Sequence, residues 1–356
     1  MTSRPPSRRL IAVLALLAFT SVLLCGWIAW RFYQAGQRSQ LALIDRLTEA
    51  GLLIAREVGP ELDRWDAIAA TGDTSGALPA AGTLLVFDDA VIAVRGEPLA
   101  YYPALAKPEV HSDDRLVKAQ AAERAGDLDA AIAGYRDAAT STARTPRAIA
   151  TAGLGRTLRA KGLLRESLTV YDELAQMAEA RVDNHPAPLV ACRERQAIFL
   201  ALGDSDASAR ERARIDSALR ARTYLIDRQT FDAFAPAFSP EPYSPPLLAR
   251  AEVVATRLWP RWRATPSGRL VAGIPGQAFA SIWRPSPAGS VAIVAPIDVL
   301  MAHPLAVASR LSTSVALEDA DGRHIWGETP PRGDTATVPL ESVGLSVRLR
   351  LWISSR

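Results

Sequence analysis

The sequence predicts an α+β protein, and three observations lead to that prediction. A stretch without charge or proline runs from Leu10 to Trp30 and has the composition of an apolar helix. From Arg115 to Arg222 the sequence is helix-like throughout and contains an internal repeat. From Gly268 onward, short apolar runs separated by glycine and proline favour an antiparallel sheet with flanking helices.

The apolar stretch at residues 10–30 has the length of a transmembrane helix, because about 20 residues cross the hydrocarbon core. Trp27 and Trp30 mark its far end, where tryptophan favours the membrane interface. The stretch ends in bulky residues and not in the small residues of a signal-peptide cleavage site, so we expect an uncleaved helix. Residues 1–9 would be a cytoplasmic tail, the lipid bilayer a partner, and the chain a single-pass inner-membrane protein with its bulk extracytoplasmic.

Residues 31–60 are predicted to form a juxtamembrane helix that ends at Gly59-Pro60. Its apolar residues form one stripe, which consists of Leu43, Leu47, Ala50, Ile54 and Val58. The stripe can pack on the chain's own domain, or it can pair with its twin. The second alternative would make a homodimer through Gln40–Val58.

Three short apolar runs at residues 83–103 predict a small strand meander, which must pack on another sheet or helix to be stable. Residues 234–246 carry five prolines and predict a stiff, extended linker. The β-rich domain expected after this linker covers residues 247–356 and contains one or two helices.

The helical region repeats itself with a period of 36 residues, because Gly126 corresponds to Gly162 and Tyr135 to Tyr171. Each unit is a helix, a short glycine turn and a second helix. Residues 112–233 therefore resemble tetratricopeptide repeats, in which small and aromatic residues pack paired helices together. The corresponding packing residues here are Gly126, Ala131, Tyr135, Gly155, Gly162 and Tyr171.

The repeat departs from that family in three respects. Its period is longer than the usual 34 residues, Ser167 stands where alanine is usual, and a third unit at Pro188–Arg222 lacks the tyrosine. An unrelated pair of helical hairpins remains the alternative.

The segment Val315–Glu328 is a strand, a tight turn at Asp319–Arg323 and a second strand. It resembles the central hairpin of PAS-like and Cache-like sensor domains, and Val338–Trp352 resembles their closing strand. In its order of parts the chain is similar to the amino-terminal extracytoplasmic input region of bacterial membrane sensor histidine kinases. That resemblance implies a PAS/Cache-like sensor domain at residues 247–356.

The kinase core that the resemblance implies is missing from these residues, which contain no ATP-binding glycine motif. We therefore expect no enzyme activity, in a chain that is either a truncated kinase or a stand-alone sensor subunit. The four histidines share no metal-ligand spacing, so no catalytic residue, cofactor or metal is expected. A net charge of +3 is too balanced for a nucleic-acid binder.

Five residues are candidates for a ligand pocket. Trp283 and Trp326 lie on predicted strands and would line the inside of the PAS-like fold. Trp259, Arg261 and Trp262 form an aromatic and cationic cluster, which could hold an anionic ligand or face lipid head groups, or could instead seal a domain junction.

Two functions are therefore expected from the sequence. The first is a membrane-anchored, extracytoplasmic module that senses an unknown small-molecule or protein signal for a two-component system. The alternative is a membrane-anchored tetratricopeptide scaffold that assembles envelope proteins.

Overall fold

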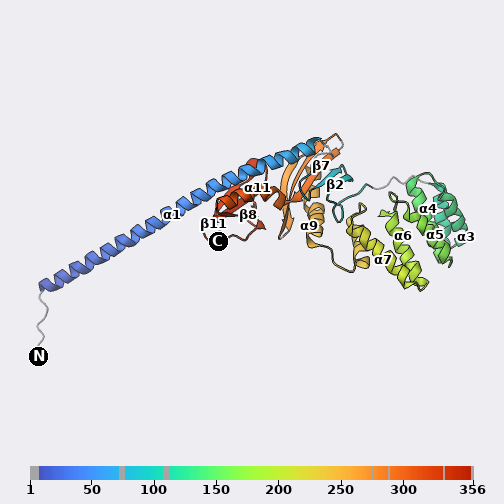
Figure 1. Ribbon diagram of the computed structural model, residues 1–356, viewed down its shortest axis with the longest axis horizontal. Helices are drawn as coiled ribbons and strands as arrows, with labels where there is room; N and C mark the ends of the chain where they lie inside the picture. The colour runs from blue at the N-terminus through green and yellow to red at the C-terminus, as the bar shows by residue number, and fades with distance from the viewer. Residues whose placement is uncertain are drawn as a thin grey trace, which may run out of the picture. The chain divides into compact units, whose positions relative to one another are not determined.

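The computed structural model describes residues 8–71, 77–106, 113–274, 276–287, 289–331 and 333–353, with side chains from Thr20 onward. The protein is α+β, as predicted, and its strands form antiparallel sheets. It divides into two compact units, one formed by Leu62–Val299 and the other by Met1–Glu61 together with Leu300–Arg356. Figure 1 shows the elements of both units along the chain.

The predicted transmembrane helix is not borne out. Among helices with described side chains, none has an apolar stretch of the length that crosses a membrane. This finding contradicts both the transmembrane helix at residues 10–30 and the single-pass inner-membrane location. Residues 1–7, most of the predicted tail at 1–9, lie outside the described residues, as do the side chains of residues 8–19.

Helix α1 (Arg8–Thr71) continues through Pro60, where the sequence predicted its end. A proline inside a helix removes a hydrogen bond and costs about 3 kcal/mol. The packing beyond it offsets that cost, because Leu62, Trp65 and Ala69 are fully buried at three- and four-residue spacing.

The unit that contains the carboxyl-terminal residues is built on a four-stranded sheet in the order β10-β11-β8-β9. Its strands are β8 (Thr313–Asp319), β9 (His324–Gly327), β10 (Ala336–Pro339) and β11 (Val347–Ile353). Helix α11 (Ile297–Arg310) precedes β8, and a 3₁₀ turn (Glu341–Val343) joins β10 to β11.

The apolar stripe of α1 packs inside this unit. Leu47, Ile54 and Val58 are at most 3% exposed. A Cβ atom at Gly51 would lie 2.6 Å from the Val338 side chain and 2.8 Å from that of Leu351, so glycine lets α1 lie directly against β10 and β11. The stripe therefore packs on the chain's own domain, which was the first of the two alternatives. Pairing of two copies through Gln40–Val58 stays a prediction.

The larger unit contains a five-stranded sheet in the order β2-β1-β7-β6-β5. Its strands are β1 (Thr83–Phe87), β2 (Val91–Gly96), β5 (Gly268–Ile274), β6 (Gln277–Ser286) and β7 (Gly289–Pro296). The predicted meander and the first strands of the predicted domain at 247–356 therefore belong to one sheet. Strand β1 pairs with β2 on one side and with β7 on the other, and all five of its residues are buried, so it lies inside the sheet and both of its faces are covered.

Two local expectations are also corrected. Residues Leu99–Tyr102 form no third strand, although Tyr102 makes a single bridge with Asp227. The expected linker at 234–246 is helical up to Phe238 and again from Pro245, because α8 (Arg228–Phe238) and α9 (Pro245–Val253) occupy its ends. Apolar side chains at helical spacing form α8, and proline suits the first turn of α9.

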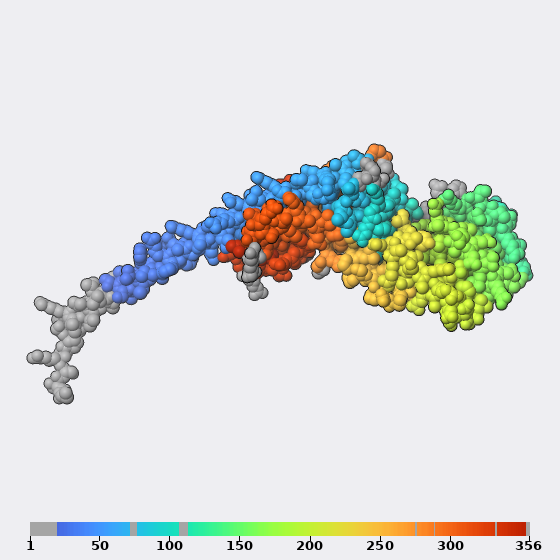
Figure 2. Space-filling view, viewed as in Figure 1, coloured from blue at the N-terminus to red at the C-terminus, as the bar shows by residue number. Residues whose placement is uncertain are grey.

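Three helical hairpins lie between β2 and α8 and form one continuous block of the larger unit (Figures 1 and 2). They are the pairs α2 (Asp114–Arg124) and α3 (Leu128–Ala138), α4 (Arg144–Ala160) and α5 (Leu164–Ala175), and α6 (Ala187–Ala201) and α7 (Ser205–Arg220). We call these six helices the helical array. A small hairpin of β3 (Arg181–Val182) and β4 (His185–Pro186) joins α5 to α6, and a π turn (Val254–Leu258) joins α9 to α10 (Trp259–Ala264).

An ion cluster fixes the end of α1 to the five-stranded sheet. Asp66, which is 8% exposed, accepts hydrogen bonds from Arg269 of β5 at 2.9 Å and from Arg284 of β6 at 2.5 Å. Burial alone would raise the pKa of Asp66, but the hydrogen bonds from Arg284 and Arg269 outweigh it and lower the pKa. Asp63 contacts the same Arg269 at 2.6 Å but is exposed.

Replacing Asp66 by asparagine should lower the free energy of unfolding by about 2 kcal/mol, because two arginines lose their counter-charge. Asp63→Asn is the control and should cost less than about 1 kcal/mol, since its carboxylate is exposed. Urea denaturation at neutral pH measures both. The Asp66 contribution is present at neutral pH and is lost as the pH falls through its lowered pKa. Equal losses in the two variants would contradict the prediction.

Candidate functional site

Three of the five predicted pocket residues lie in the core beneath the five-stranded sheet. Trp259, Trp262 and Trp283 are at most 8% exposed. The ring of Phe87 lies 5.1 Å from that of Trp259 and 5.6 Å from that of Trp262, between ring centroids. The indole N–H of Trp262 donates to Ser281 Oγ at 3.2 Å. These rings fill a packed aromatic core.

The other two predicted pocket residues lie elsewhere. Arg261 is exposed on α10, outside that core. Trp326 is on β9 in the other unit, where it lines a hollow of about 370 Å³ together with α11 and β8. The five residues therefore do not form one site.

The glycines of the repeat have a structural role at the hairpin turns. Gly126, Gly162 and Gly203 each follow the end of a helix with φ between 75° and 83°, the left-handed conformation that glycine adopts without strain. At each turn two backbone hydrogen bonds run back into the preceding helix, as from the Asp127 N–H to the Ala122 carbonyl at 3.1 Å. Gly203 shows that the third unit, at Pro188–Arg222, uses the same turn.

The two repeat tyrosines pack against glycines of α4. A Cβ atom at Gly153 would lie 2.5 Å from the ring of Tyr135, and one at Gly155 would lie 2.7 Å from the ring of Tyr171. Both tyrosines are 1% exposed. Ala131 and Ser167 are fully buried at equivalent positions, and Ser167 Oγ also donates to the Gly155 carbonyl at 2.7 Å, which accounts for serine there.

Ion pairs connect the first helices of the three hairpins. On α2, Glu123 binds Arg156 of α4 through two contacts at 2.7 Å and 2.8 Å. On α6, Glu194 binds Arg159 of α4 at 2.6 Å. The hydrogen bond from Arg156 is the main reason why the pKa of Glu123 is lowered, although burial opposes it. We call this set, together with Arg193, the arginine seam.

The arginine seam carries more positive than negative charge. Arg193 lies next to Glu194 at 3.3 Å, and its guanidinium lies 5.2 Å from the ring centre of Phe234. Three arginines thus face two glutamates across α2, α4 and α6. Sequence analysis missed these residues, because nothing in the sequence indicates which charged side chains of separate helices meet.

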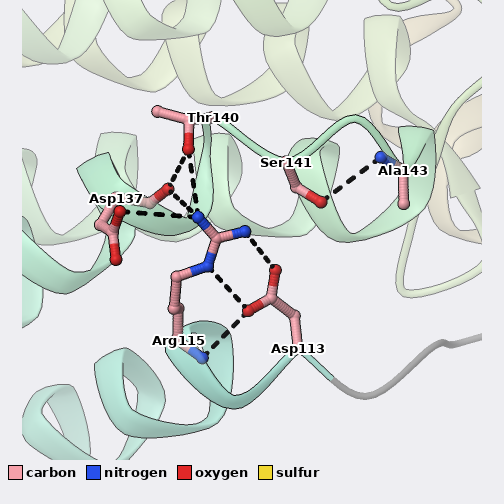
Figure 3. A network of polar contacts seen from close by, with 6 residues as sticks. All are labelled: Asp113, Arg115, Asp137, Thr140, Ser141 and Ala143. Carbon is pink, nitrogen blue, oxygen red and sulfur yellow. Dashed lines mark hydrogen bonds and ion pairs between the residues drawn. The ribbon is translucent and has the colours of Figure 1, made fainter.

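A second network fixes the beginning of the array (Figure 3). Asp113 caps α2 by accepting from the Arg115 backbone N–H at 3.0 Å, and it pairs with the Arg115 guanidinium at the same distance. The guanidinium also donates to the Asp137 carbonyl and to Thr140 Oγ1, both at 3.2 Å. These contacts join the start of α2 to the end of α3.

One carboxylate connects the end of the array to the sheet domain. Glu97, which follows β2, contacts Arg222 at 3.2 Å and Arg250 of α9 at 3.3 Å. Arg222 follows α7 with φ 54°, the conformation that glycine provides at the other three turns. Its guanidinium also donates to the Pro98 carbonyl at 3.1 Å, so the side-chain contacts explain why an arginine occupies a strained position. We call Glu97, Arg222 and Arg250 the junction triad.

His185 connects the array to α8. Its Nδ1 atom lies 2.9 Å from the hydroxyl oxygen of Thr230, and its ring lies edge-on to Phe234 with 5.6 Å between centroids. Burial, aided by the charge of Arg193, lowers the pKa of His185.

Comparison with known proteins identifies no relative. No protein-family model, no curated protein and no solved structure matches the chain. Within the described residues, no group of three or more histidine, cysteine, aspartate or glutamate side chains is placed to hold a metal ion. The geometry of the arginine seam and the junction triad is therefore the basis for a functional proposal.

Gly155→Ala should destabilise the array by about 1–3 kcal/mol, because the new methyl group would overlap the ring of Tyr171. Ala160→Ser, on the exposed end of the same helix, should change the stability by less than about 0.5 kcal/mol. Thermal and urea unfolding measure both. Equal stability of Gly155→Ala and the native protein would show that the tyrosine ring can move aside at no cost.

The lowered pKa of His185 predicts acid sensitivity. The unfolded chain binds a proton near pH 6.5, whereas the folded chain resists it, so stability is complete above that pH and declines below it. The melting temperature should therefore fall between pH 7.5 and pH 5.5. The decline should be smaller in His185→Gln, and an unchanged slope in that variant would assign the acid sensitivity to other groups.

Proposed function

We propose that the protein is a non-catalytic signal-sensing module in which the helical array binds a protein partner and the five-stranded sheet responds. The observation that carries this proposal is the junction triad. Arg222 at the end of the array and Arg250 of α9 share the carboxylate of Glu97, which follows β2. A displacement of the array therefore changes the contacts of a buried arginine in the sheet domain.

The strand order supports a sensor. Counted along the chain, the five strands lie in the order second, first, fifth, fourth and third. This is also the order of the sheet in PAS-like domains. The segments Val315–Glu328 and Val338–Trp352, on which the sequence resemblance rested, belong instead to the four-stranded sheet of the other unit. The proposal retains the sensing part of the sequence-based expectation without the membrane anchor.

The arginine seam supports a protein partner with acidic side chains. Arg156, Arg159 and Arg193 lie on neighbouring helices and are each between 39% and 51% exposed. An arginine can accept a second carboxylate through its remaining N–H groups. The larger number of arginines than glutamates in the seam favours an acidic segment of a partner.

Affinity capture with the full chain tests the proposal. A partner captured by the native protein should bind about tenfold or more weakly to Arg193→Glu, because the reversed charge repels an acidic segment. Arg165→Glu is the matched control, since Arg165 is exposed on α5 away from the seam, and it should bind normally. Equal binding by both variants, or no partner at all, would refute the proposal.

Hydrogen exchange separates a sensor from a scaffold. Glu97→Gln keeps the side-chain shape but removes the charge shared by Arg222 and Arg250, and we expect a loss of about 2 kcal/mol of stability. Amides of β1, β7 and α7 should exchange faster in this variant, whereas the exposed control Glu241→Gln should leave them unchanged.

Partner binding to the native protein should alter hydrogen exchange in β1 and β7 if the protein is a sensor. Exchange changes confined to the array would favour the scaffold.

A further inference from the structure

The hollow beside Trp326 lies within the unit formed by α1, α11 and the four-stranded sheet. It has a volume of about 370 Å³, within the size range of small-molecule sites. Leu305 and Ala308 of α11 and Val315 of β8 supply apolar side chains. Trp326, which is half-buried on β9, supplies an aromatic ring. A compact ligand with a short apolar part would fit this lining.

Backbone polar groups border the hollow because β9 is short. Strand β8 pairs with β11 along all its residues from Thr313 to Asp319. Its pairing with β9 begins only at Ala316. Within the described part of the chain, residues 313–315 of β8 therefore have a strand neighbour on one side only. Backbone groups at such an edge are satisfied by water or by a ligand.

The described lining of the hollow carries one negative charge, and Arg310 of α11, between Ser309 and Ser312, is not part of the lining. Among the described residues that line it, Glu328 is the only one with a formal charge. Ser309, in the last turn of α11, and Ser312, just after the helix, also line it, so the negative end of the helix dipole lies at its border. The serine hydroxyls can accept hydrogen bonds from an N–H donor.

We propose that this hollow binds a small organic cation, an ammonium group with a short apolar tail. The ammonium group would lie near the Trp326 ring and the Glu328 carboxylate, with its N–H groups toward hydroxyl and carbonyl oxygens at the end of α11. Its tail would contact Leu305 and Ala308. An anion of the same size is disfavoured by the carboxylate and the helix end. This inference goes beyond the binding of a protein partner and does not depend on it.

A titration of the ¹⁵N-labelled full chain tests the proposal. The protein has eight tryptophans, and the indole N–H signal of Trp326 is the one that disappears in Trp326→Phe. With n-butylammonium chloride this signal should shift with a dissociation constant of about 1 mM. Butyrate and 1-butanol, which match the probe in size, should bind at least about tenfold more weakly because they lack the positive charge.

Two variants complete the test. Glu328→Gln, at an exposed position, should weaken butylammonium binding by about threefold to tenfold. Glu341→Gln, exposed on the 3₁₀ turn and outside the hollow, should bind as the native chain does. The proposal is overturned if butyrate shifts the Trp326 signal as strongly as the ammonium, if no probe shifts it, or if Glu328→Gln and Glu341→Gln bind equally.

Discussion

Strand β1 is buried along its whole length and lies between β2 and β7 in the five-stranded sheet. Its register places Leu85 opposite Ala292 of β7, across a long separation in sequence. This pairing closes a loop that contains the helical array and α8 to α10. Closing so long a loop costs conformational entropy, and the aromatic core around Phe87, Trp259 and Trp262 supplies the burial that offsets it.

The junction triad gives that closed loop a defined geometry. Arg250 is 7% exposed, and its guanidinium donates to the Ala81 carbonyl at 2.9 Å as well as contacting Glu97. A buried arginine is costly unless its charge is paired, which makes the position of Glu97 matter for the sheet domain. The position of Glu97 matters for Arg222 as well. Side-chain contacts hold the backbone of Arg222 in a left-handed conformation that glycine would adopt more easily.

The parts of the fold that sequence predicts well are those with local signals. Gly126 and Gly162 mark hairpin turns because a left-handed residue must end each helix, and that requirement is visible in the sequence. The pairing of β1 with β7 has no such local signal, so the strands were assigned to separate parts. The prediction that five residues line one pocket was wrong for a related reason. Proximity of Trp259 and Trp262 in sequence does not show that Phe87 covers them, or that Trp326 belongs to another unit.

The burial pattern of the array shows which of its hairpins is coupled to the sheet. The first two hairpins are held by cores whose described members include no residue of the five-stranded sheet, such as Tyr135 with Leu158 and Tyr171 with Leu174. The core around Tyr171 also includes Val182 of β3 and Val190 of α6. In the third hairpin, Leu189 of α6 and Ile215 and Leu219 of α7 share a core with Leu85 and Phe87 of β1. Local opening of α2 to α5 therefore leaves the sheet core intact, whereas a shift of α7 disturbs it. Since the arginine seam extends from α2 to α6, a partner that binds along it would reach the hairpin through which the array contacts the sheet.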